Sequence, residues 1–395
     1  MLNPAITLFW LLLFSIVFTL MGVFYARRHL DTIEDYVVAR NTQSTAATTL
    51  TLMATSLGAW ILFAPIPLWL TALIVLFSTL IYTSYGGLRA SIFTDKIQMA
   101  IIVPLLGLLI YFAWQAVGDI NTIKAGLRQY APELLNWNAT GGMRAGATFF
   151  VAILLTGLFH QGNWQRIYAA KSRNAMRCGF LLAGILVAPI IAIMGLFGLA
   201  FVASGSQADS SIALFNLLLP TVSPWVLIAI IPLGLALVMS STDTAISAVS
   251  SLIAVDIRRL RPKTSNQSLM RLSRLLVIPL TIPIWWTVSQ GYSVLYLFLL
   301  ADILCSAAAF PVFFSLFNRN YGARLAIFST ISGLLCGLSV FPGPNEPPTF
   351  LLESFLLAAI TPIIISLVFL PFTARKNNDD FEQLKILIRR LDQPS

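Results

Sequence analysis

The sequence predicts an all-α, polytopic membrane protein, and three of its features support this fold class. Of the 395 residues, 57% are hydrophobic and only 10% are charged, whereas a soluble domain carries about 25% charged residues. The apolar residues form long continuous runs, which suit helices that satisfy their own backbone hydrogen bonds better than the short alternating strands of a membrane barrel. The basic residues gather between these runs. A lipid bilayer is therefore the solvent that fits this chain.

Eleven apolar runs have about the 17–25 residues that a membrane-spanning helix needs. They cover residues 5–25, 47–65, 68–85, 97–116, 147–162, 179–203, 223–254, 272–290, 293–316, 323–341 and 352–373. The run at 223–254 is too long for a perpendicular span, so we expect it to tilt or to project into the cytosol. The loop at 117–146 has room for one amphipathic helix. We expect a single transmembrane domain over residues 1–373 and a short cytoplasmic tail over residues 374–395.

The basic residues also predict an orientation. Arg27 and Arg28 follow the first run, which places that side in the cytosol and the N-terminus outside. When the sides alternate from there, only Lys124, Arg128 and Arg144 of the 25 Lys and Arg residues fall outside. We therefore predict a plasma membrane protein, in a bacterium the inner membrane, with a cytoplasmic C-terminus. The same topology explains the net charge of +9 without a nucleic-acid partner.

The composition argues against an enzyme and against a classical metal centre. The three cysteines, Cys178, Cys305 and Cys336, lie in or at the end of apolar runs and have neither disulfide nor metal-ligand spacing. His29 and His160 are the only histidines. Since no nucleophile–base pair or metal cluster stands out, a catalytic function is not expected.

Three acidic residues fall within or beside the predicted spans, where charge is costly and commonly functional. Asp95 stands at the cytosolic start of the span 97–116, where a favourable charge at a helix N-terminus explains it equally well. Asp302 lies within 293–316, and a structural polar contact is the favoured explanation. Asp243 lies in the middle of 223–254, within the polar sequence MSSTDT of residues 239–244.

This polar run predicts a cation site. Ser240, Asp243 and Thr244 are spaced i, i+3, i+4 and therefore share one face of a helix. Their hard oxygen atoms suit a hard cation, although hydroxyls that bond back to the preceding turn are the alternative. The span 47–65 also has small and polar residues, at 54–60, which indicate either a broken helix or close helix packing.

Several stretches together resemble the sodium:solute symporter family, and they occur in the order of that family. DYVVAR at 35–40 resembles the stretch before core helix 1, although it lacks one glycine. The other matching residues are Tyr82-Thr83, Gly86-Gly87, Ala90, Thr94-Asp95 and Gln98 at the junction of core helices 4 and 5, Gln165-Arg166 and Ala169-Ala170-Lys171 at the end of core helix 6, and 239–243, Ser250-Ser251 and Asp256 in core helix 8.

The resemblance implies a LeuT-type bundle with two inverted five-helix repeats, in which a coupling Na+ ion and a small organic solute bind. The implied main sodium site uses the carbonyl groups of Ala54, Leu57 and Leu237 and the hydroxyls of Ser240 and Ser241. A second implied sodium site uses Asp95, Ser240, Asp243 and Thr244. The solute is implied to bind near Ser56, Gly58, Trp60, Thr156 and Gly157. A packing role explains Trp60 equally well, and His160 is favoured as a satisfied polar residue.

The sequence departs from the family between core helices 1 and 4. Only Ile66 and Pro67 separate Pro65 from residues that already resemble core helix 4, so core helices 2 and 3 are expected to be missing and the first repeat incomplete. Three functions follow. The chain is a sodium-coupled symporter, an internally deleted variant without transport, or a symporter-shaped sensor or scaffold that binds without transport. The solute and the oligomeric state are not specified.

Overall fold

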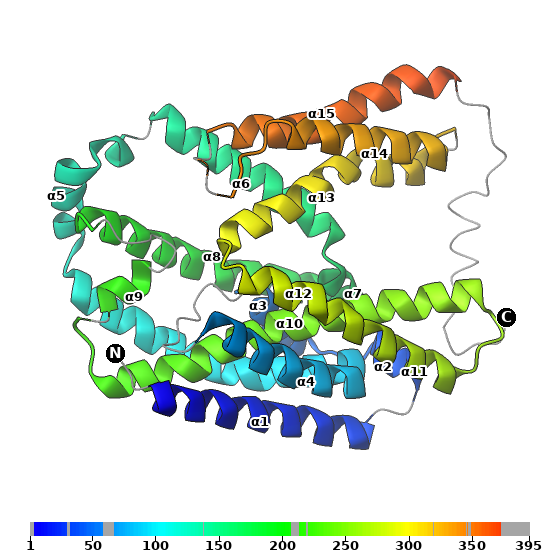
Figure 1. The fold of residues 1–395 in the computed structure, drawn as a ribbon, viewed down its shortest axis with the longest axis horizontal. Helices are drawn as coiled ribbons and strands as arrows, with labels where there is room; N and C mark the ends of the chain where they lie inside the picture. The colour runs from blue at the N-terminus through cyan, green and yellow to red at the C-terminus, as the bar shows by residue number, and fades with distance from the viewer. Residues whose placement is uncertain are drawn as a thin grey trace. The chain divides into compact units, whose positions relative to one another are not determined.

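The computed structural model describes residues 4–29, 32–57, 67–136, 138–206, 213–218, 220–318, 320–344, 346 and 349–372. The regular elements in these ranges are helices, and one isolated bridge joins Gln43 to Ala170. The helices pack into two compact units (Figure 1). Among the described residues, the first unit comprises residues 4–135 and 161–291, and the second comprises residues 136–160 and 292–372. The single domain expected over 1–373 stays a prediction.

The first unit holds most of the helices. They are α1 (Pro4–His29), α2 (Ile33–Val37), α3 (Thr45–Ser56), α4 (Leu68–Val117), α5 (Ile120–Tyr130), η1 (Pro132–Leu135), α7 (Gln161–Ala169), α8 (Arg173–Ala203), α9 (Ala213–Leu218), α10 (Pro224–Leu260), α11 (Asn266–Val277), η3 (Ile278–Leu280) and α12 (Thr281–Ser289). Helix α4 packs along both α1 and α10, while α3 packs against α8. The amphipathic helix expected in the loop at 117–146 is α5, which buries Ile123 and Leu127.

The second unit consists of α6 (Thr140–Phe159), α13 (Val294–Phe317), α14 (Ala323–Leu338), α15 (Leu351–Phe369) and η4 (Leu370–Phe372). Its core is a small cluster that includes Ala152, Leu299 and Ile303. Close packing of α14 on α15 depends on Gly333, because a Cβ atom there would lie 2.4 Å from Pro362. An exposed ion pair joins Arg144 to Glu353.

The eleven predicted spans all correspond to helices. Among the described residues, eight helical segments are long and apolar enough to cross a membrane, and two shorter apolar helices cover Thr45–Ala54 and Ala323–Leu338. One of the eight, α4, contains two predicted spans, 68–85 and 97–116. Of the predicted span 47–65, the structure describes residues 47–57, and these are helical to Ser56. The join at 58–66, where two core helices are expected to be missing, lies outside the described residues, as does the tail 374–395.

The junction within α4 is shorter than the sequence suggested. We expected a gap from residue 86 to residue 96, but the only non-helical residue inside α4 is Gly87, with φ 55° and ψ −146°. A side chain at this position would also place its Cβ atom 2.3 Å from the carbonyl oxygen of Tyr36. Glycine therefore allows both the kink and the contact with α2. Residues 88–96 are helical as a consequence, and they carry buried polar side chains into the unit.

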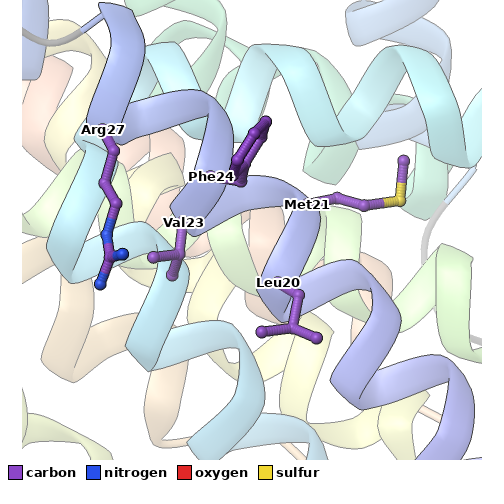
Figure 2. A pocket seen from close by; sticks show the side chains of 5 residues that line it. All are labelled: Leu20, Met21, Val23, Phe24 and Arg27. Carbon is purple, nitrogen blue, oxygen red and sulfur yellow. The ribbon is translucent and has the colours of Figure 1, made fainter.

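Much of the surface of these helices is apolar. Phe77, Phe150 and Leu181 are between 63% and 68% exposed, as expected of side chains that face lipid. A groove on α1 is lined by Leu20, Met21, Val23, Phe24 and Arg27 (Figure 2). None of the predicted site residues lines this groove, so it belongs to the apolar exterior of α1 rather than to the candidate site.

Candidate functional site

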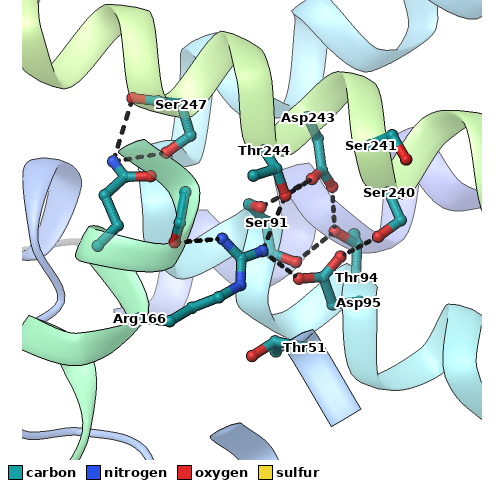
Figure 3. A network of polar contacts seen from close by, with 12 residues as sticks. Thr51, Ser91, Thr94, Asp95, Arg166, Ser240, Ser241, Asp243, Thr244 and Ser247 are labelled. Atoms are coloured by element: carbon teal, nitrogen blue, oxygen red, sulfur yellow. Dashed lines mark hydrogen bonds and ion pairs between the residues drawn. The ribbon is translucent and has the colours of Figure 1, made fainter. Parts of the chain in front are cut away.

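Helix α10 presents a polar face that is buried within the first unit. Ser240, Asp243, Thr244 and Ser247 are each at most 2% exposed. They follow one another at helical spacing, so their side chains share one face, as the sequence predicted. Figure 3 shows this face directed towards polar side chains of α4 and α7. The result is a polar network in the interior of the first unit.

Asp243 is surrounded by hydroxyl groups from α4. Its Oδ2 atom accepts hydrogen bonds from Tyr82 at 2.7 Å and from Thr94 at 3.0 Å, and its Oδ1 atom accepts one from Ser91 at 2.8 Å. All four residues are buried. A carboxylate is an acceptor-only group with several lone pairs, and these hydroxyls fill the positions that water would otherwise take.

Asp95 is paired with a buried guanidinium group. Arg166 of α7 donates through Nη2 to Asp95 Oδ2 at 2.8 Å, and these side chains are 1% and 0% exposed. The other carboxylate oxygen accepts a hydrogen bond from Ser240 at 2.6 Å. The same Nη2 atom donates to Thr244 Oγ1 at 2.8 Å, and Nη1 donates to the carbonyl oxygen of Gly162 at 3.0 Å. One nitrogen atom thus bridges two of the four side chains predicted for the second sodium site.

Asp95 and Arg166 are both buried in the interior of the first unit. Residues 88–96 continue α4 as a helix, and α7 packs against α10. The cytosolic side expected for both residues stays a prediction. The network contains two acids and one base, which leaves one formal negative charge when both acids are ionised.

The residues of the implied main sodium site lie on α3 and α10, which pack against one another. Ser241 Oγ donates to the carbonyl oxygen of Leu237 at 3.2 Å, which is the bond to the preceding turn that the sequence left open as the alternative to cation binding. Ser240, by contrast, is turned towards Asp95. Ala54 is fully buried in the last turn of α3, and Leu57 caps that helix. Carbonyl groups in the last turn of a helix have no partner within the helix, so the predicted ligands Ala54 and Leu57 lie where such oxygen atoms are expected.

The predicted solute residues fall into two groups. Gly58 and Trp60 lie outside the described residues, and so does the side chain of Ser56. Thr156 and Gly157 lie in the last turn of α6, in the second unit, and His160 caps that helix. The solute site implied by the resemblance therefore stays a prediction.

Five residues of the network were not selected from the sequence as ligands, namely Tyr82, Ser91, Thr94, Arg166 and Ser247. The signal for α4 was present, because Ser91, Thr94, Asp95 and Gln98 follow the i, i+3, i+4, i+7 pattern of one helix face. This helical pattern was missed because the residues were assigned to the junction between core helices 4 and 5. Arg166 belongs to the Gln165-Arg166 pair that resembles the end of core helix 6, but only the packing of α7 places it beside Asp95.

The chain is similar to known membrane transporters. It is 27% identical over 267 residues to the spermidine transporter DUR31 of Candida albicans, covering 67% of this chain and 49% of that protein. It is 25% identical over 319 residues to the sodium/glucose cotransporter 4 of Danio rerio, covering 69% and 48%. The chain thus spans about half the length of the curated relatives it matches.

A solved structure shares the fold. A Na+-coupled sialic acid symporter, in a substrate-bound outward-open state, superimposes with a TM-score of 0.74 and 16% identity, covering 94% of this chain and 98% of that chain. The fold is therefore the LeuT-like, all-α, multi-pass membrane fold that the resemblance implied. The sodium:solute symporter family matches residues 4–333, which is most of the chain. The chain belongs to the sodium:solute symporter family.

Proposed function

We propose that the chain is a secondary active transporter that couples the entry of a small organic solute to sodium. The single observation that carries this proposal is the match of the sodium:solute symporter family to residues 4–333. Helices α3 and α10, which carry the predicted ligands of one sodium site, also pack against one another. Hydroxyl and carbonyl oxygens form a hard, uncharged ligand set of the kind that a monovalent cation prefers. Ala54, Leu57, Leu237, Ser240 and Ser241 would hold this sodium ion.

We further propose that one sodium ion binds in the state described. The Arg166 guanidinium already occupies the space between Asp95 and Thr244, at 2.8 Å from each. A second sodium ion at Asp95, Ser240, Asp243 and Thr244 would therefore have to displace a charged group of the same sign. With both acids ionised, the network carries one negative charge, which would attract sodium electrostatically to this part of α10.

The proposed orientation follows the basic residues, with the N-terminus outside and the C-terminus in the cytosol of a bacterial cell. The identity of the solute is open, and Ser56, Gly58, Trp60, Thr156 and Gly157 stay the predicted solute residues. The loss of core helices 2 and 3 also stays a prediction. Sequencing the gene around the codons for residues 65–67 would test it.

The test uses the purified full chain and sodium alone. We expect the melting temperature to rise in NaCl relative to equimolar KCl, because an ion that binds only the folded state stabilises it, by about 1.4 kcal/mol at ten times its dissociation constant. Ser241→Ala should reduce this sodium response. The matched control is Ser251→Ala, because Ser251 lies on the same helix outside the predicted ligand set and its hydroxyl also donates to a backbone carbonyl group, that of Ala248. This control should retain the response.

Equal responses in Ser241→Ala and the unsubstituted chain would contradict the assigned site. Proteoliposomes then separate transport from binding, because solute-stimulated entry of 22Na+ is expected of a symporter. A sensor or scaffold would show the sodium response in the melting temperature without any such entry, and an internally deleted variant would show neither.

A further inference from the structure

The second unit contains a buried acid that the proposed sodium sites do not use. Asp302 lies in α13, eight residues from its start, about 12 Å along the helix axis. It is 1% exposed and is flanked by Leu299 and Ile303 of the apolar cluster. A carboxylate in such surroundings is expensive, and in a membrane helix it commonly marks a functional site.

Asp302 has no positive partner among the residues that the structure describes. Each of the described ion pairs involves another acid, and the Asp302 Oδ2 atom has no hydrogen-bond partner. Asp95 is equally buried but is held by both Arg166 and Ser240. The comparison indicates that Asp95 is a satisfied structural acid, whereas Asp302 keeps an unfilled acceptor at membrane depth.

The surroundings of Asp302 also favour a positive charge. Its carboxyl group lies beside Thr156 of α6, the helix that packs against α13. The Thr156 Oγ1 atom is buried and has no hydrogen-bond partner among the described residues. Helix α6 ends at Phe159, so the negative end of its dipole lies within one turn of Thr156. A carboxylate, a hydroxyl and a helix C-terminus thus lie together.

We infer that Asp302 and Thr156 form the recognition point for a protonated amine of the transported solute. An alkylammonium group has three N–H donors and one positive charge. It would give one hydrogen bond and its charge to Asp302, and a second hydrogen bond to Thr156. A neutral polyol could satisfy the hydroxyl but would leave the charge of Asp302 unpaired. The inference rests on the proposed symport, since it assigns a solute class to the same transporter.

The test compares two probes of the same chain length, putrescine and its uncharged diol analogue, on the purified full chain in NaCl and in KCl. In the unsubstituted chain, putrescine should raise the melting temperature at concentrations about tenfold or more below those the diol needs. The reason is that the ammonium group pairs with the buried Asp302 carboxylate, whereas the diol leaves that charge unpaired, and the loss of a buried charge pair has a large effect on binding. Asp302→Asn should abolish this preference and keep the sodium response. The matched control is Glu353→Gln, which removes an exposed acid of the same unit and should retain both.

Two further variants keep the test decisive if Asp302→Asn does not fold. Asp302→Glu preserves the charge and should retain the preference for putrescine, whereas Thr156→Ala should weaken putrescine binding about two- to tenfold, as expected of one lost hydrogen bond. Equal binding of the two probes, or an unchanged preference in Asp302→Asn, would overturn the inference while a sodium response leaves the proposed symport intact. A preference for putrescine that needs Asp302 but is accompanied by no sodium response would support the amine site and contradict sodium coupling instead.

Discussion

Replacement of Arg166 is expected to be among the most damaging single changes in the first unit. Arg166→Gln removes the only cation that the structure describes in a network where Asp95 and Asp243 are both fully buried. Breaking a buried ion pair by removing one partner typically costs about 3–5 kcal/mol, since the other charge is left uncompensated. Arg166 also bonds Thr244 and the Gly162 carbonyl group, so three hydrogen bonds are lost together. We therefore expect a loss at the upper end of this range.

A double-mutant cycle separates the ion pair from the other contacts. Asp95→Asn alone leaves a buried guanidinium, and the double variant leaves neither charge, so the double variant should be more stable than the sum of the single losses predicts. The expected coupling energy is about 1–3 kcal/mol, as for residues of one network. The free energy of unfolding would be measured by denaturant titration in mixed micelles.

The exposed pair of Arg144 and Glu353 supplies the control, because its side chains are 45% and 37% exposed. Arg144→Gln should cost at most about 1 kcal/mol, as is usual for a solvent-screened pair. Additive losses in the Arg166 and Asp95 cycle, or a loss for Arg166→Gln no larger than the loss for Arg144→Gln, would refute the electrostatic account of the network.

Three further predictions follow from individual residues. In Arg166→Gln, the space between Asp95 and Thr244 becomes available to a second cation, so the sodium response of the melting temperature should exceed that of the unsubstituted chain; a smaller response would argue against displacement. Gly87→Ala should cost at least about 1–3 kcal/mol through backbone strain, plus the clash with Tyr36, while Gly107→Ala in the same helix, with no atom within 4 Å of the added Cβ, should be tolerated. Hydrogen bonds from Thr122 hold the pKa of Asp119, the N-terminal cap of α5, below its ordinary value. This cap therefore stabilises α5 above the ordinary carboxyl pKa, and its contribution is lost as the pH falls through the lowered value; hydrogen exchange of the α5 amides should accelerate there, and Asp119→Asn should remove that pH dependence.

The acids at membrane depth show which features of the site could be predicted from the sequence and which could not. The shared polar face of Ser240, Asp243 and Thr244 was predicted from the sequence of α10 alone, because these spacings share one face in any helix, while cation binding there stays a prediction. The partners on α4 were not predicted, because a junction was expected where the chain kinks at a single residue, Gly87. Asp302 was expected to make a structural polar contact; its carboxyl group lies beside Thr156, and its Oδ2 atom has no hydrogen-bond partner among the described residues.

The sequence by itself determined the fold class, the helical spans and the family, since these depend on long apolar runs and on ordered local motifs that survive without knowledge of the packing. Only the tertiary structure decided which charges meet. Asp95 and Arg166 lie 71 residues apart, and nothing local to either one distinguishes an ion pair inside the unit from two charges at the cytosolic surface. That choice depends on the path of α4 beyond Gly87 and on the packing of α7 against α10. The predicted second sodium site therefore holds a guanidinium group in this structure.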